Sequence, residues 1–269
     1  MTKRVILSIQ SAVMHGAVGN DAAMPIYQHL KHPAERLDTV RLAAHPGFGT
    51  KALSVTPADE IDALLSDYRR LAGFSALAAV QTGYFGHHSQ IDPVARFLTA
   101  SRTEQSPLMY LLDPVLGDGG RLYVDQAISD AMRETLLPLA DIITPNQFEL
   151  GLLAGTTIAD EADAIAAARR LLRGRLACVV VTGVTTAAGQ ITDIVITPET
   201  ETLITTEKQE NGVSGSGDVL SALFLSAVVR GAEVAEAATA ASQTTAHIIS
   251  RADTPLTMPV LDYIWAQTP

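Results

Sequence analysis

The chain has 269 residues, of which 47% are hydrophobic and 18% charged, and its formal net charge is −10. This content suits one large α/β domain or two small domains. The negative charge argues against nucleic-acid binding, because phosphate backbones attract clustered Lys and Arg. The apolar run of "MTKRVILSIQ" is too short for a signal peptide, and "VLSALFLSAVV" is too short to cross a bilayer. We therefore expect a cytoplasmic protein that binds no membrane.

Short apolar runs alternate with helical patterns along the chain. We expect strands at residues 4–10, 37–43, 75–83, 107–115, 141–146 and 176–183, and a hairpin at 190–206. We expect helices at 20–31, 59–71, 90–101, 125–137 and 159–172, and two long helices that begin near residues 217 and 233. This alternation predicts a doubly wound, mostly parallel sheet with helices on both faces, in one domain spanning residues 1–269.

The loops that directly follow the strands are the places to look for a site, because ligands of open α/β sheets bind beyond the carboxyl ends of the strands. These loops carry the polar motifs "SIQSAVMHGAVGN", "TGYFG", "DPVLGDGG", "TPNQFE" and "VTG". The adjacent His87 and His88 lack further spaced ligands, so we expect a solvated loop there rather than a metal site. Cys178 is the one cysteine, and its apolar neighbours predict a buried core thiol.

The motif "DPVLGDGG" places Asp113 at the end of an expected strand and Asp118 in a Gly-rich turn. A carboxylate at a strand end can hold a cation, directly or through water. Asp, Gly and Pro also favour turns without any ligand. Both interpretations stay open for this motif on its own.

The motif "TPNQFE" places Glu149 at the third helical position if Asn146 is the helix cap. That spacing is close to a capping box, which has a purely structural role. The functional alternative is that both side chains share the helix-start face and position a hydrated Mg²⁺ near nucleotide phosphates.

The motif "GVSGSGDVLSALF" combines a Gly-rich turn with the start of an apolar helix. Successive free N–H groups at such a start form an anion hole, here at Gly215, Ser216 and Gly217. Asp218 lies at its edge, where a carboxylate can accept a proton from an incoming hydroxyl. The alternative is an Asp that only favours the helix dipole. The spacing fits neither a Walker A loop nor a dinucleotide fingerprint.

These motifs, in this order, resemble the ribokinase-like superfamily and, within it, the pyridoxal kinases. The resemblance runs nearly end to end, and its specific parts are the "IQS" opening, "DPVLGD" and "LADIITPNQFEL". It implies ATP-dependent phosphorylation of the 5′-hydroxymethyl group of pyridoxal, pyridoxine or pyridoxamine. It also implies Mg²⁺ with ATP as co-substrate, a monovalent cation, and a homodimer.

The resemblance assigns a role to each motif residue. Asp218 corresponds to the family's proton-abstracting aspartate, beside the anion hole, and Ser11, His45 and Tyr84 correspond to residues that line the pyridine-ring pocket. Residues around ATP and its metal ions correspond to Asp113, Asp118, Asn146, Glu149, Thr182 and Gly183, with Asp113 and Glu149 nearest the metal. Without the resemblance, Ser11 could cap a strand-end N–H, His45 could be a surface loop residue and Tyr84 a packed turn aromatic.

The sequence departs from the family pattern after His45, where the family often has Thr and this chain has Pro46. The stretch between "VVVTG" and "SGSGD" is also short and has little of the basic or aromatic content expected over an adenine. A hydroxymethylpyrimidine kinase is the main alternative, although it would open with a Gly-rich "GSD" segment where this chain has "SIQSAV". A non-catalytic protein that senses vitamin B6 or nucleotide is the second alternative, and the presence of Asp218 argues against it.

Overall fold

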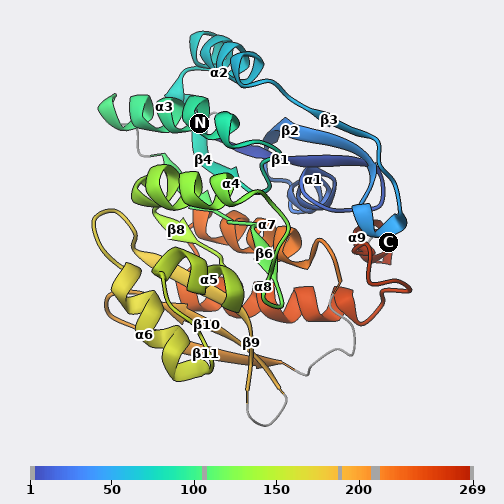
Figure 1. The fold of residues 1–269 in the computed structure, drawn as a ribbon, viewed down its shortest axis with the longest axis vertical. Coiled ribbons are helices and arrows are strands. Elements are labelled where there is room, and N and C mark those ends of the chain that lie inside the picture. Colours follow the sequence, from blue (N-terminus) through green and yellow to red (C-terminus); the bar gives the residue numbers. More distant parts are fainter. Residues whose placement is uncertain (1–3, 105–107, 187–189, 207–212, 267–269) are drawn as a thin grey trace.

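A computed structural model describes residues 4–104, 108–186, 190–206 and 213–266 of the chain, and Figure 1 shows its fold. Nine strands form one sheet in the order β11-β10-β9-β8-β5-β4-β1-β2-β3. Their bounds are β1 Val5–His15, β2 Ala34–Ala44, β3 Leu53–Val55, β4 Leu77–Thr82, β5 Met109–Leu112, β8 Ile142–Ile143, β9 Cys178–Thr185, β10 Ile191–Ile196 and β11 Glu201–Thr206. A separate small hairpin pairs β6 Gly117–Asp118 with β7 Arg121–Leu122.

The six strands β2, β1, β4, β5, β8 and β9 are parallel to one another, whereas β3, β10 and β11 pair antiparallel at the two edges. The expected mostly parallel sheet is therefore confirmed. Since the six central strands run in one direction, all their carboxyl ends lie along the same edge of the sheet. That edge is the one on which the polar motifs were expected.

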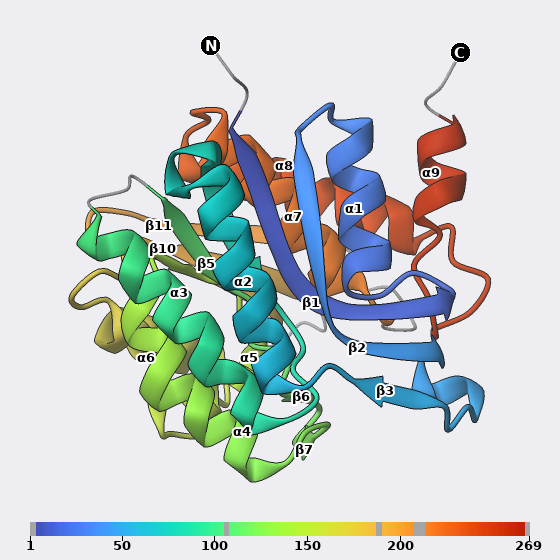
Figure 2. The ribbon, with the colours of Figure 1, turned by 90° about the horizontal axis from the view of Figure 1, so that it is seen from above.

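Helices cover both faces of the sheet (Figure 2). Residues of α2 to α6 pack in one core cluster, and residues of α1, α7, α8 and α9 pack in the other. The bounds are α1 Asn20–His29, α2 Ala58–Ala72, α3 Ile91–Thr103, α4 Gln126–Ala131, α5 Gln147–Ala154, α6 Glu161–Leu171, α7 Ser216–Val229, α8 Val234–Ile249 and α9 Val260–Ala266. None of the helices in the described ranges is long and apolar enough to span a membrane.

The apolar composition of the strands follows from their burial by helices on both faces of the sheet. In β9, Val179 and Val181 face the first cluster, whereas Cys178 and Val180 face the second. Side chains alternate between the faces of a strand, so a strand buried on both faces is apolar at every position. Cys178 is a free thiol buried in the core, as its neighbours predicted.

Most of the expected elements are confirmed, and the differences have local causes. The helix expected at 125–137 becomes α4, and the chain then leaves α-helical geometry in a π-helical turn, Met132–Leu136, shortly before Pro138. β3 has three residues and pairs with the end of β2, so it gives no periodic signal. α9 follows the two predicted C-terminal helices and was not expected.

Candidate active site

The carboxyl ends of the parallel strands bring the predicted site residues to one edge of the sheet. Ser11 lies in β1, Tyr84 follows β4, Asp113 follows β5 and Asn146 follows β8. Thr182 lies in β9 and forms an isolated parallel bridge with Asn146. Helix α7 begins at the same edge, because the hypothetical Cβ of Gly217 would lie 3.9 Å from the Asp113 carboxylate.

The turn before α7 has the backbone geometry that its glycines allow. Gly215, the N-cap, has φ +92°, and a Cβ there would lie 2.4 Å from the carbonyl oxygen of Ala17. A side chain at this position would be strained and would collide with backbone. Among the described residues, Ser216 N–H donates to the Val213 carbonyl, whereas the N–H groups of Gly217 and Asp218 have no acceptor. These two free donors at the start of a 14-residue helix suit an anion.

Asp218 is a buried carboxylate with one partner from a distant part of the chain. Its Oδ2 accepts a hydrogen bond of 2.7 Å from the N–H of Gly19. Burial raises the pKa of Asp218 to about 6, and the Gly19 N–H partly opposes that rise. Within the described residues no hydrogen bond reaches the other oxygen, so Oδ1 is available to accept a proton from a bound alcohol.

Gly19 is a site residue that the motifs did not single out. It precedes α1 with φ +56°, and a Cβ there would lie 2.3 Å from both the carbonyl oxygen and the Oγ of Ser11. The close approach of Ser11 and the donation to Asp218 both depend on this glycine. The "VGN" ending of the first loop motif was the only signal for it in the sequence.

Asp113 is held by two hydroxyl groups. Its Oδ2 accepts a hydrogen bond of 2.7 Å from Ser221 Oγ, and Ser221 Oγ lies 3.1 Å from Thr144 Oγ1. Burial holds the pKa of Asp113 well above its usual range, and the nearby charges of Asp218 and Glu149 raise it further. A cation placed beside these carboxyl groups would relieve that repulsion.

Asn146 and Glu149 form the capping box that their spacing indicated. Asn146 Oδ1 accepts from Glu149 N–H at 2.9 Å, and Glu149 Oε2 accepts from Asn146 N–H at 2.9 Å. Glu149 Oε1 also accepts from Leu116 N–H at 2.8 Å and, at 3.4 Å, from Gly117 N–H. Burial raises the pKa of Glu149 to about 7 in spite of these donors. Asp118 lies on the exposed β6–β7 hairpin, where its Oδ1 accepts from Gly119 N–H at 2.7 Å.

A β-bulge at the end of β9 presents Thr182 and Gly183. The pairing register with β10 shifts between Thr192 and Ile194. As a result, Thr182 and Gly183 of β9 lie opposite the single residue Asp193 of β10. Gly183 has φ +70°, and its N–H donates to Asp193 Oδ1 at 2.8 Å. Asp193 is 7% exposed and was not predicted, because the alternating pattern of its strand gave no sign of a functional side chain.

The residues expected around the pyridine ring lie on neighbouring segments. His45 is half-buried at the end of β2, where its Nδ1 accepts from Gly47 N–H at 3.2 Å, and burial lowers its pKa. Tyr84 is half-buried, burial raises its pKa, and its carbonyl accepts from Thr39 Oγ1 at 2.6 Å. His87 and His88 are exposed, in agreement with the solvated loop predicted there.

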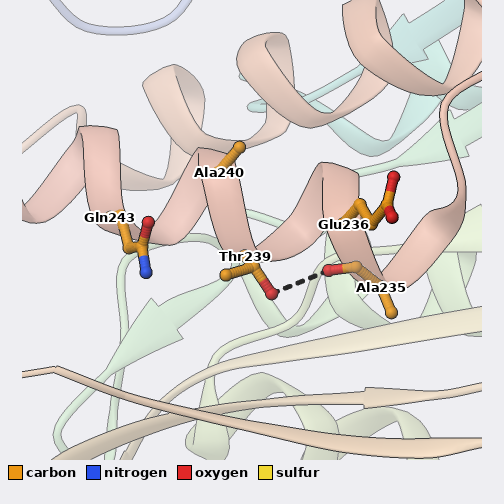
Figure 3. A pocket seen from close by; sticks show the side chains of 5 residues that line it. All are labelled: Ala235, Glu236, Thr239, Ala240 and Gln243. Carbon is orange, nitrogen blue, oxygen red and sulfur yellow. Dashed lines mark hydrogen bonds between the residues drawn. The ribbon is translucent and has the colours of Figure 1, made fainter.

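A hollow on the protein surface lies away from this edge. It has a volume of about 360 Å³ and is lined by Ala235, Glu236, Thr239, Ala240 and Gln243, all on the outer side of α8 (Figure 3). Thr239 Oγ1 donates to the Ala235 carbonyl of the same helix at 2.8 Å. None of the predicted site residues lines this hollow, so it takes no part in the arrangement described above.

The carboxylates at the strand-end edge fit magnesium better than a metal bound by protein side chains alone. In the part of the chain that the structure describes, no group of three or more His, Cys, Asp or Glu side chains is arranged to hold a metal ion. Magnesium is usually held by one or two carboxylates together with waters and substrate phosphates. Asp113 can supply such a carboxylate, whereas both oxygens of Glu149 are already taken by N–H groups.

Comparisons with known proteins agree on one family. The family model described as phosphomethylpyrimidine kinase matches residues 50–258. The pyridoxine/pyridoxal/pyridoxamine kinase of Bordetella avium is 33% identical over 88% of this chain and 82% of its own length. A pyridoxal kinase of Rubrobacter xylanophilus is 34% identical over 88% and 84%. The structure of Leishmania donovani pyridoxal kinase with ADP and pyridoxamine superposes with a TM-score of 0.87, at 27% identity over 97% of this chain and 94% of that chain.

Proposed function

The chain belongs to the pyridoxal kinase family, within the wider phosphomethylpyrimidine kinase family, and from this we propose that it phosphorylates the 5′-hydroxymethyl group of pyridoxal with ATP. Pyridoxine and pyridoxamine are the further acceptors, since a relative carries all three in its name. The observation that carries the proposal is the position of the buried Asp218 carboxylate beside free N–H groups at the start of α7. The whole chain, residues 1–269, acts as one kinase domain in this proposal.

The chemistry follows from what each group can do. The alcohol oxygen attacks the γ-phosphorus of ATP, the bond from that phosphorus to the β-phosphate oxygen breaks, and ADP leaves. The proton of the alcohol passes to Asp218 Oδ1, while the Gly19 N–H holds Oδ2 in place. The free N–H groups of Gly217 and Asp218 hold the charge that develops on the transferred phosphoryl group.

A magnesium ion would be held by Asp113, and by Glu149 through water, where it would neutralise phosphate charge. The burial of Asp113 among like charges supports this assignment, and the backbone donors on both oxygens of Glu149 limit that residue to a contact through water. Asp118 and Asn146 frame the phosphates, and Thr182 with Gly183 borders the nucleotide. A monovalent cation at the same edge would serve the same charge balance.

The ring of the acceptor lies against Ser11, His45 and Tyr84 in this proposal. Ser11 and Gly19 are in close approach, so the ring wall adjoins the group that holds Asp218. By family analogy the protein works as a homodimer in the cytoplasm. Native mass and cell fractionation test those two expectations independently of the chemistry.

A substrate panel tests the proposed function directly. Purified protein is incubated with Mg-ATP and, in turn, pyridoxal, pyridoxine, pyridoxamine and hydroxymethylpyrimidine, and the ADP and phosphate ester are measured. We expect one ADP per ester, with pyridoxal among the acceptors used. The name of the matching family model makes hydroxymethylpyrimidine the second candidate. Turnover of that alcohol with none of the B6 vitamers would overturn the proposal in favour of the second candidate.

A further inference from the structure

The segment Thr254–Met258 between α8 and α9, here called the C-terminal strap, borders the candidate site. No motif in "TPLTM" pointed to the site, yet the strap touches three of its walls. Figure 2 shows the chain between α8 and α9 passing beside the ends of β1 and β2. The strap contacts the turn before α7, the loop between β1 and α1, and the loop that follows β2.

The first contact is with the turn before α7. Ser214 N–H donates to the carbonyl of Pro255 at 2.9 Å. The side chain of Met258 is buried, and its Cγ would lie 3.4 Å from a Cβ on Gly215. The strap therefore fixes the residues that lead into the free N–H groups of α7.

The second contact is with the loop that holds Gly19. Ala17 N–H donates to Thr257 Oγ1 at 2.5 Å, across 240 residues of sequence. Ala17 is 8% exposed, so its N–H has little access to water if that hydroxyl is removed. The carbonyl oxygen of Ala17 would in turn lie 2.4 Å from a Cβ on Gly215. The loop between β1 and α1 therefore contacts the turn before α7.

The third contact is with the His45 loop. A Cβ on Gly47 would lie 2.5 Å from Leu256 Cδ2 and 3.0 Å from His45 Nδ1. Leu256 therefore packs against the same turn that His45 caps. One short segment thus links the walls assigned to the acceptor ring with the start of α7.

We propose that Thr257 is a positioning residue for Asp218, because its hydroxyl fixes the loop whose Gly19 N–H holds Asp218 Oδ2. Thr257 acts through Ala17 and touches no reacting atom. Loss of the Thr257 hydroxyl should affect the use of the acceptor more than the binding of ATP, because this hydroxyl bonds the loop that holds Asp218 rather than a residue assigned to the nucleotide. The kinetic part of this inference rests on the proposed function, whereas its structural part does not.

The test replaces the hydroxyl by a methyl group of similar size, in Thr257→Val, in the full-length protein. We expect kcat/KM for pyridoxal to fall roughly tenfold, from the loss of one buried hydrogen bond. The KM for ATP should stay within about twofold of wild type, whereas a loss of nucleotide binding would raise it. Thr257→Ser returns the hydroxyl and should recover most of the loss. Thr239→Val is the matched control, because it removes a hydroxyl that bonds only within α8 (Figure 3).

Amide hydrogen exchange supplies a readout that needs no turnover. In ligand-free protein, the peptide covering residues 13–20 should exchange faster in Thr257→Val than in wild type, Thr257→Ser or Thr239→Val. Unchanged exchange in that peptide, or an equal rise in both KM values, would overturn the role of Thr257. If wild-type protein phosphorylates none of the B6 vitamers, the proposed function fails, and the exchange comparison still decides the role of the strap.

Discussion

Two helices of this fold carry a carboxylate at their third position. The hydrogen bonds of the two side chains favour a structural role for one and a chemical role for the other. Glu149 is the third residue of α5 after its cap Asn146, and Asp218 is the third residue of α7 after its cap Gly215. Both are buried and both have a raised pKa. Their hydrogen bonds differ, and that difference decides what each group can still do.

Glu149 accepts from backbone N–H groups on both oxygens, and one of these donors is the N–H of its own helix cap. Asp218 has a cap without a side chain, and its one partner comes from a loop 199 residues away in sequence. A carboxylate with an unoccupied oxygen beside free N–H groups can accept a proton. One that is surrounded by N–H donors mainly stabilises its helix start. Position in the helix alone therefore does not distinguish the two roles.

The strongest test of this comparison is Asp218→Asn. The amide keeps the acceptor for Gly19 N–H but cannot take up the proton, so kcat should fall by about 10²–10⁴, the usual contribution of a general base. ATP binding, measured by calorimetry, should be retained. Turnover near the wild-type rate would show that the unoccupied oxygen of Asp218 is not used.

The pH dependence is the next largest effect. Asp218 has to be ionised to accept a proton, and its pKa is raised to about 6. The kcat/KM for pyridoxal should therefore fall by about tenfold for each pH unit below that value. An acid limb set by an unperturbed aspartate near pH 4 would contradict the buried environment described for this group.

Glu149→Gln tests the other helix. The amide nitrogen of Gln cannot accept from a backbone N–H, so the hydrogen bonds to one of the two side-chain oxygens are lost. This loss costs about 1–3 kcal/mol of unfolding free energy. The melting temperature should drop by about 2–4 °C per kcal/mol. In addition, the Mg²⁺ concentration for half-maximal rate should rise.

The effect of Glu149→Gln should depend on pH in a defined direction. The folded pKa of Glu149 is raised to about 7, so wild type loses stability as pH rises through that value, whereas the Gln variant has no such titration. The difference in melting temperature between wild type and Glu149→Gln should therefore become smaller from pH 6 to pH 8 in metal-free buffer. A gap that widens over this range would contradict the raised pKa.

Pro46→Thr is the smallest change and leaves both helices untouched. Pro46 is exposed and opens the short turn capped by His45. Thr would add a hydroxyl and an N–H near the ring wall, and one neutral hydrogen bond is worth about 0.5–1.5 kcal/mol. The KM for pyridoxal should fall several-fold, with kcat and the KM for ATP unchanged. A lower kcat with a higher KM for ATP would place this loop over the phosphates instead.

The sequence predicted the parts of the site that depend on neighbours in the chain. The helix start at Asp218, the capping box of Glu149 and the strand end at Asp113 all have local signals of spacing and turn composition. The pairing of these groups with residues from distant parts of the chain had no such signal. Gly19, Ser221 and Thr257 meet the site across long sequence separations, and no pattern in a single sequence reports which distant residues meet.

The same separations affect how the protein refolds. The capping box of Glu149 closes over 3 residues, whereas the bond from Gly19 to Asp218 closes over 199 and the bond from Ala17 to Thr257 over 240. Contacts between distant residues carry the larger loop-closure entropy and tend to form late. After dilution from denaturant, helical circular dichroism should therefore recover before kinase activity does. We therefore expect Asp218, the proposed proton acceptor, to gain its Gly19 partner in one of the last steps of assembly.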